Sequence, residues 1–183
     1  MDDRKSGITT LDTRIAYENR WMKIREDTIR RPDGSTGIYG VVVKSDFVII
    51  VPYQDGMLHL VQQYRYPIGS RQWEFPQGSW EDTPDADPRE LARGELKEET
   101  GLMAEELQEI GKLFPLYGTV TQSYRIFLAT RLKPGRQNLE TEEQDLITRA
   151  FPLKEVEAMI LNGTIQDAGT VASFGMLRMK GLI

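Results

Sequence analysis

A single helix with clear signals at both ends interrupts an otherwise strand-rich chain, and this order constrains the fold most. Asp87 is a suitable N-cap, and Pro88 suits the first helical position. Gly101 suits the left-handed conformation that commonly ends a helix. The residues between carry an apolar stripe at helical spacing. The sequence therefore predicts a helix over residues 88–100.

Most of the remaining elements are expected to be strands. Residues 8–31 carry β-branched and aromatic residues in loose alternation, and the turn residues Pro32-Asp33-Gly34 end this segment. Five further strands are expected at 38–43, 47–51, 57–66, 123–131 and 146–151, with a tight turn at Asp55-Gly56 and a short strand at 72–75. Helices are expected at 153–161 and 168–180. This order predicts an α+β fold in which helices pack on a sheet.

The composition excludes several kinds of catalytic site. The chain of 183 residues has no cysteine, so disulfides, thiolate nucleophiles and cysteine zinc sites are excluded. Its single histidine, His59, alternates with apolar neighbours and is interpreted as a structural strand residue. Acid–base catalysis is therefore expected to come from carboxylates.

The net charge, the apolar runs and the first residues predict the partners and the location of the protein. The net charge is −5, which argues against binding to nucleic acid or anionic membranes because both need a basic surface. No apolar run approaches the roughly 18 residues of a membrane span, and the first residues lack the apolar core of a signal peptide. We expect a cytoplasmic protein with no nucleic-acid or membrane partner.

Three carboxylates lie close together on the expected helix. Glu95, Glu98 and Glu99 are spaced three and four residues apart, which places them on one helical face. Like charges at this spacing repel one another unless a cation lies between them. Oxygen ligands select hard cations such as Mg²⁺. Taken alone, the helix favours a solvated acidic face, since runs of charge usually are.

The sequence around these carboxylates resembles the Nudix box. The pattern G-x5-E-x7-R-E-U-x-E-E-x-G-U, with U a bulky aliphatic residue, is matched at its end by Glu95, Leu96, Glu98, Glu99, Gly101 and Leu102. The resemblance implies a Nudix hydrolase whose α/β/α sandwich holds a mixed sheet between helices. It also implies Mg²⁺, with Mn²⁺ as a substitute, bound by Glu95, Glu98, Glu99 and a main-chain carbonyl near Gln77.

Two positions depart from this pattern. Gly94 stands where the family has arginine, Ala86 stands where it has the first glutamate, and the loop from Gly78 is two residues longer. In the family these two side chains form an ion pair that braces the loop. When both side chains are replaced together, no charge is left without a partner, whereas replacing only one would leave the other unpaired. We expect a changed loop geometry and unchanged metal carboxylates.

Further segments resemble the Nudix branch that hydrolyses ADP-ribose and nucleoside diphosphate sugars. They are Trp21 with the Pro32-Asp33-Gly34 turn, 63–67, 73–78 and 139–146. The resemblance implies a homodimer with exchanged N-terminal strands, in which residues 1–45 form an antiparallel ribbon and residues 46–183 form the catalytic domain. It also implies a late acidic loop that supplies the general base. Glu142 is the predicted base, with Glu140 and Glu143 as alternates.

The remaining site residues are assigned from the chemistry of the substrate. A pyrophosphate needs positive charge, and Arg65 and Arg71 are the nearest arginines in sequence to the box, although either can be a plain surface residue. Arg65 and Glu98 are counted with Glu142 as catalytic. Glu74 is expected to face the cleft and to touch metal or ribose. Trp21 either stacks on the base or packs in the ribbon.

Two functions remain open on the sequence alone. The leading hypothesis is a pyrophosphohydrolase that yields a nucleoside monophosphate and a sugar phosphate. Tyr117 stands where ADP-ribose hydrolases have proline, and its ring is expected to bind substrate by packing against a sugar or base. Nucleoside diphosphate sugars such as GDP-mannose are therefore as open as ADP-ribose. The alternative is a catalytically silent Nudix-like module that binds nucleotide sugars as a sensor. The three retained glutamates favour the enzyme.

Overall fold

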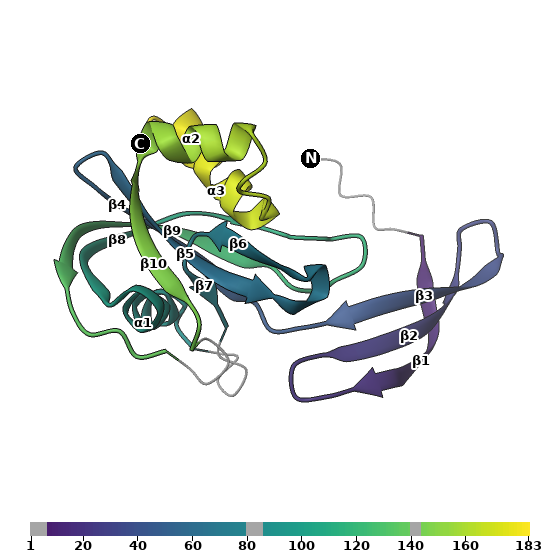
Figure 1. The fold of residues 1–183 in the computed structure, drawn as a ribbon. Helices are drawn as coiled ribbons and strands as arrows, with labels where there is room; N and C mark the ends of the chain where they lie inside the picture. The colour runs from purple at the N-terminus through teal and green to yellow at the C-terminus, as the bar shows by residue number, and fades with distance from the viewer. Residues whose placement is uncertain (1–6, 80–85, 140–143) are drawn as a thin grey trace. The chain divides into compact units, whose positions relative to one another are not determined.

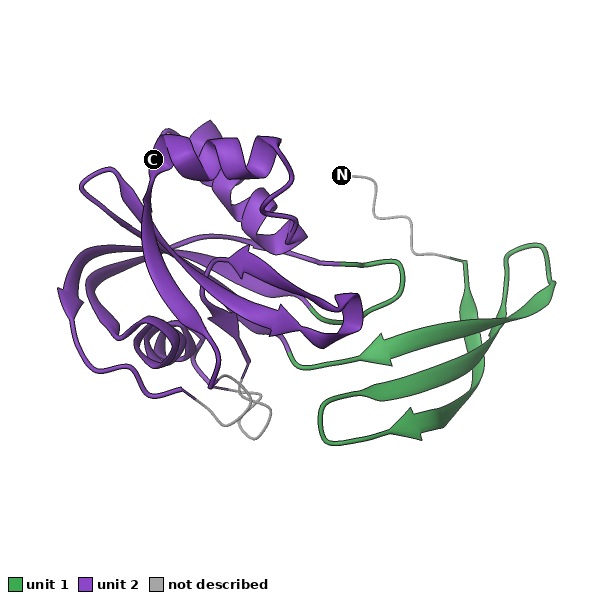
Figure 2. Ribbon diagram, in the orientation of Figure 1, with its two compact units in different colours: residues 1–45, 116–122 green, residues 46–115, 123–183 purple. Residues whose placement is uncertain are grey.

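The computed structural model describes residues 7–79, 86–139 and 144–183. Within it the chain forms two compact units, coloured separately in Figure 2. Unit 1 comprises Met1–Ser45 with Leu116–Gln122, and unit 2 comprises Asp46–Pro115 with Ser123–Ile183. None of the helices in the described ranges is long and apolar enough to cross a membrane.

Unit 1 is built on an antiparallel sheet of three strands, β1 (Thr9–Glu18), β2 (Lys23–Arg30) and β3 (Thr36–Val43). The antiparallel ribbon expected at the N-terminus is therefore confirmed. The segment 116–122 adds to β3, because Val42 N donates to Thr119 O at 2.9 Å and Thr121 N donates to Val42 O at 3.0 Å. Every residue of β1 is exposed.

Unit 2 contains a mixed sheet of seven strands. They are β4 (Phe47–Gln54), β5 (Met57–Arg65), β6 (Ser70–Glu74), β7 (Gln77–Gly78), β8 (Leu102–Leu113), β9 (Tyr124–Pro134) and β10 (Ile147–Pro152). The main path runs β10-β5-β4-β9-β8, while β6 pairs with β5 and β7 pairs with β4. The β4–β9 pair is parallel and the other pairs are antiparallel.

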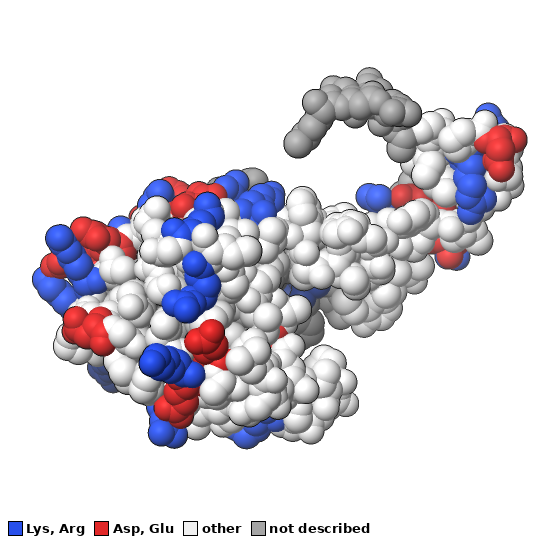
Figure 3. All heavy atoms as spheres, turned by 90° about the horizontal axis from the view of Figure 1, so that it is seen from above, with Lys and Arg blue, Asp and Glu red and all other residues white. Residues whose placement is uncertain are grey.

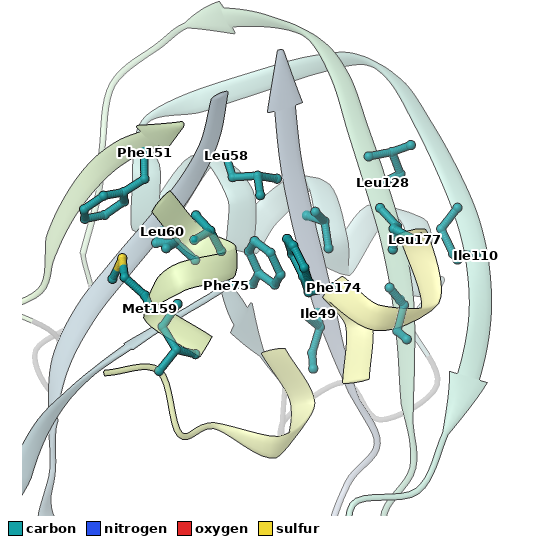
Figure 4. Packing of buried hydrophobic residues seen from close by; sticks show 14 of the residues in the cluster. Ile49, Leu58, Leu60, Phe75, Ile110, Leu128, Phe151, Met159, Phe174 and Leu177 are labelled. Atoms are coloured by element: carbon teal, nitrogen blue, oxygen red, sulfur yellow. The ribbon is translucent and has the colours of Figure 1, made fainter. Parts of the chain in front are cut away.

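Helices cover both faces of this sheet. Figure 1 shows α1 (Pro88–Thr100) on one face and α2 (Leu153–Leu161) with α3 (Ala168–Met179) on the other. The alternation of β4 explains this, since Val48 and Ile50 belong to the apolar cluster with α1, while Ile49 belongs to the cluster with α2 and α3. Figure 4 shows the cluster that contains Ile49. The expected α/β/α sandwich is confirmed.

The sheet is split where β6 and β7 enter it. Strands β4 and β5 pair with each other only beside their shared turn, at Tyr53↔Leu58 and Gln54↔Met57. Farther along, β5 pairs with β6 and β4 pairs with β7 instead of with each other. Between these strands, Ile50 N donates to Pro76 O at 2.9 Å. A short 3₁₀ turn, η1 (Tyr66–Ile68), joins β5 to β6. The split leaves Glu74 buried and Gln77 half-buried within the sheet of unit 2.

Charged side chains of both signs share the surface. Figure 3 shows Lys and Arg side chains interspersed with Asp and Glu side chains on one face. Several of them are paired, such as Arg125 with Glu109 at 2.6 Å.

Candidate active site

The three glutamates of α1 are placed by the helix that the sequence predicts. Asp87 accepts a hydrogen bond from Arg89 N at 2.8 Å as the N-cap, and Gly101 ends the helix with a φ of 70°. Glu95 and Glu99 are buried, at 7% and 0% exposure, and Glu98 is half-buried. Buried carboxylates are costly unless hydrogen bonds or cations compensate them. A fully solvated acidic face is thus excluded.

Strand β7 packs directly on these carboxylates. Gln77 N donates to Glu99 Oε2 at 3.0 Å. A Cβ built on Gly78 would lie only 2.6 Å from Glu95 Oε1, so no larger residue fits without moving that carboxylate. The pairing of β7 with β4 therefore holds Gln77 and Gly78 against two of the three predicted metal ligands.

The C-terminal end of α1 is fixed by later segments of the chain. Gln137 Nε2 and Thr148 Oγ1 both donate to Glu99 O, at 2.5 and 2.9 Å. Asn138 N donates to Glu98 O at 3.1 Å. These bonds satisfy carbonyl groups that a helix end leaves unpaired. They also hold the residues that precede 140–143 beside the end of α1.

The donor set of this region suits a hard divalent cation. Among the residues that the structure describes, no three acidic side chains converge closely enough to hold a metal ion as they stand. The groups at hand are nevertheless all oxygen donors: three carboxylates on one helix and the main chain around Gln77. Such donors fit Mg²⁺ or Mn²⁺ rather than a soft metal.

Arg65 and Glu74 form a partly buried ion pair. Arg65 donates to the Glu74 carboxylate from Nε at 3.1 Å and from Nη2 at 2.5 Å, and Gln63 Nε2 donates to it at 2.8 Å. Burial raises the pKa of Glu74, which is 1% exposed, while Arg65 opposes that rise. The Arg65 side chain keeps 39% exposure. Glu74 thus orients a guanidinium group that can still meet a ligand.

Arg71 is engaged with protein groups. Its Nη1 pairs with the Asp145 carboxylate, and its Nη2 donates to Asp145 O at 2.7 Å and to Gln62 O at 3.1 Å. The residue therefore ties β6 to the segment that follows 140–143, and its predicted contact with substrate is untested. The predicted base Glu142 and its alternates Glu140 and Glu143 lie outside the described residues.

The predicted site residues fall into both units. Trp21 and Tyr117 belong to unit 1, where they are 52% and 86% exposed. Arg65, Arg71, Glu74, Gln77, Glu95, Glu98 and Glu99 belong to unit 2. Of the two departures from the box, Gly94 lies half-buried within α1 and Ala86 lies just before its N-cap.

A cavity of about 360 Å³ beside Glu74 was not predicted. Eight described residues line it: Arg65, Pro67, Ile68, Gln72, Glu74, Gln166, Asp167 and Ala168. The last three are the first residue of α3, its N-cap Asp167 and the residue before it, some ninety residues away from Glu74 in the chain. The signal that could have found them is an aspartate directly before the expected helix at 168–180, since aspartate is a common N-cap and Thr170 N donates to Asp167 Oδ2 at 2.7 Å.

Comparison with known families agrees with this geometry. The NUDIX domain model matches residues 44–174, and a model described as the nucleoside diphosphate sugar hydrolase N-terminal domain matches residues 8–42. The chain belongs to the Nudix family. The expected enzyme class, a Nudix pyrophosphohydrolase, is confirmed by this membership.

Individual relatives of this Nudix protein support the same class. It is 32% identical over 165 residues to the ADP-ribose pyrophosphatase of Mycobacterium tuberculosis. This alignment covers 89% of this chain and 79% of that protein. It is 35% identical over 102 residues to the GDP-mannose pyrophosphatase of Citrobacter koseri, covering 53% and 52%. A crystal structure of an ADP compounds hydrolase matches with a TM-score of 0.84 at 22% identity, covering 96% of this chain and 97% of that one, which supports the fold.

Proposed function

We propose that this enzyme hydrolyses the pyrophosphate bond of ADP-ribose or of nucleoside diphosphate sugars such as GDP-mannose. The products are a nucleoside monophosphate and a sugar phosphate. One observation carries the proposal: Glu95 and Glu99 pack on Gly78 and Gln77, while Glu74, three residues before Gln77, holds Arg65 in an ion pair. Relatives named for both substrate types support it.

We propose Mg²⁺ as the cation, with Mn²⁺ as a substitute. Glu95, Glu98, Glu99 and the main chain at Gln77 would hold it, since Glu95 and Glu99 lie against β7 and Glu98 belongs to the same helix. When bound, the cation would offset the negative charge of the diphosphate oxygens.

The chain's own residues then bind and activate the reactants. Arg65 binds a diphosphate oxygen through its partly exposed guanidinium group, which Glu74 keeps in one orientation. Glu142 takes the proton from the attacking water, with Glu140 and Glu143 as alternates. Arg71 binds Asp145, two residues after Glu143, and we retain its contact with substrate as a proposal.

Unit 1 is proposed to contribute the nucleoside contacts and the dimer interface. Trp21 and Tyr117 present exposed aromatic rings that can stack on a base or a sugar. Residues Ile8, Leu11, Ile15, Tyr17, Ile38 and Tyr39 of this unit are exposed as well, which supports a homodimer that exchanges N-terminal strands. The cysteine-free composition supports the cytoplasm as the location.

Product analysis tests the proposed function. The protein is incubated with Mg²⁺ and a panel of ADP-ribose, GDP-mannose and other nucleotide sugars, and phosphate is measured after treatment with phosphatase. Nucleoside monophosphate and sugar phosphate in equal amounts are the expected products. A protein that binds these compounds and cleaves none of them is instead the silent sensor.

A further inference from the structure

The main-chain carbonyl of Glu99 is held by two side chains from distant parts of the chain. Gln137 Nε2 donates to Glu99 O at 2.5 Å, and Thr148 Oγ1 donates to the same oxygen at 2.9 Å. At the other end of this residue, Glu99 Oε2 accepts a hydrogen bond from Gln77 N at 3.0 Å. Three segments that lie 22, 38 and 49 residues away in sequence therefore converge on one predicted metal ligand.

The last turn of α1 is closed by main-chain groups up to the Glu98 carbonyl. Gly101 N donates to Lys97 O at 2.9 Å, and Asn138 N donates to Glu98 O at 3.1 Å. The next carbonyl, that of Glu99, instead accepts from two side chains, so both of its lone pairs are engaged. One donor would satisfy this oxygen, whereas two donors also fix its direction. The arrangement therefore restrains the position of Glu99 itself.

Thr148 connects this carbonyl to the strands that carry Glu74. Thr148 on β10 is paired with Val61 on β5, and Val61 is paired in turn with Glu74 on β6. Residues directly opposite one another in neighbouring antiparallel strands share a face of the sheet, and neighbouring strands lie about 4.8 Å apart. Thr148, Val61 and Glu74 thus form one cross-strand row. The row has the holder of Glu99 at one end and the holder of Arg65 at the other.

We propose that Thr148 and Gln137 are positioning residues that fix Glu99, and with it the metal site on α1, relative to the sheet. The cross-strand row then sets the distance between this site and Arg65. The inference rests on the proposed function, because it takes Glu99 as a metal ligand and Arg65 as a diphosphate ligand. A bound diphosphate needs both groups at once, so a small displacement of either weakens their combined action.

The test compares Thr148→Val, Gln137→Met and a variant that carries both changes. Valine keeps the shape of threonine and suits a strand, and methionine keeps the length of glutamine, so each change removes a donor with little effect on packing. Mn²⁺ binding is measured without substrate, from the electron paramagnetic resonance signal of the free ion. Because either donor alone still satisfies the carbonyl, the dissociation constant should rise about threefold in each single variant and about tenfold or more in the double variant.

Two further variants separate positioning from general stability. Thr148→Ser retains the hydroxyl group, so its Mn²⁺ dissociation constant should stay within about 1.5-fold of the wild-type value. Thr130→Val is the matched control, because Thr130 Oγ1 donates to Glu106 Oε2 at 3.2 Å and this hydrogen bond does not involve α1. Its Mn²⁺ affinity should equal that of the wild type. Circular dichroism checks that every variant is folded, and if the double variant unfolds, the comparison of Thr148→Val with Thr148→Ser decides.

The outcomes distinguish this inference from the proposed function. A change of less than threefold in the folded double variant, or equal losses in Thr148→Val and Thr148→Ser, overturns the positioning role. A wild type that binds no Mn²⁺ overturns it together with the proposed metal site. A wild type that binds Mn²⁺ and cleaves none of the nucleotide sugars contradicts the proposed function, while the Mn²⁺ affinities of the variants still decide the positioning role.

Discussion

Gly78 shows how closely single residues constrain the candidate site. Glycine is needed at this position for lack of space and not for its backbone conformation, because the carboxylate of Glu95 occupies the place that a Cβ would take. The colliding atoms are the end of a flexible side chain, which can move aside without disturbing the core. A replacement here should therefore displace a metal ligand rather than unfold the protein.

We predict that Gly78→Ala raises the Mg²⁺ concentration for half-maximal activity about tenfold. The melting temperature should fall by no more than about 3 °C. Metal titration of the initial rate and thermal unfolding check the two parts. Gly40→Ala is the control, because a Cβ at Gly40 meets nothing within 4 Å. An unchanged metal requirement in Gly78→Ala would remove Glu95 from the ligand set.

His59 gives the molecule a predictable response to pH. It lies half-buried on β5, and burial lowers its pKa from 6.5. The folded state therefore holds fewer protons than the unfolded state below pH 6.5, so this contribution to stability is complete above that pH and declines as the pH falls through it. As the only histidine, His59 can be titrated by NMR without ambiguity. We expect an apparent pKa below 6.5, and a value at or above 6.5 would refute the assignment.

At the scale of elements, local signals predicted some segments and missed others. The helix at 88–100 was predicted because Asp87 and Gly101 cap it regardless of the rest of the fold. Strand β8 (Leu102–Leu113) was not predicted, because it is an edge strand in which only Leu107 and Ile110 are buried. Leu102, Ala104 and Leu113 pack against the core while only partly buried, and the acidic residues between them obscure the alternation.

Helix α3 offers a test of the packing described for it. Gly175 lies within the helix, and a Cβ there would meet nothing within 4 Å, whereas a Cβ at Gly169 would lie 2.6 Å from Ile49 Cδ1. We predict that Gly175→Ala stabilises the protein by about 0.5–1 kcal/mol, or about 1–4 °C in melting temperature. Gly169→Ala should destabilise it by about 1–3 kcal/mol. Equal shifts in the two variants would contradict this packing of α3.

At the scale of the whole molecule, the site is assembled from distant segments. The box carboxylates were predicted because they are close in sequence. The Gln77–Glu99 bond and the approach of Asp167 to Glu74 were not, because they depend on the split of the sheet and on the return of α3. No local pattern reports such contacts between residues that are far apart in the chain.

The exposed apolar residues of unit 1 lead to a prediction about assembly. We expect a species of twice 20.9 kDa in sedimentation velocity at micromolar concentration. Ile38→Asp, which places a charge on a side chain with 68% exposure, should shift the equilibrium toward 20.9 kDa while preserving the circular dichroism spectrum. A wild-type protein that sediments at 20.9 kDa throughout would contradict the homodimer.

The turnover of Glu99→Gln on ADP-ribose and GDP-mannose in Mg²⁺ tests the central claim most directly. Glutamine can still accept the hydrogen bond from Gln77 N, so the fold and the melting temperature should be preserved. The loss of one charge among the three carboxylates should weaken metal binding and lower kcat/KM about 100-fold or more. The predicted result is that the wild-type enzyme cleaves at least one of the two substrates, while the variant is folded and inactive. A variant that retains near wild-type rates would contradict the assignment of Glu99, and with it the metal site on α1.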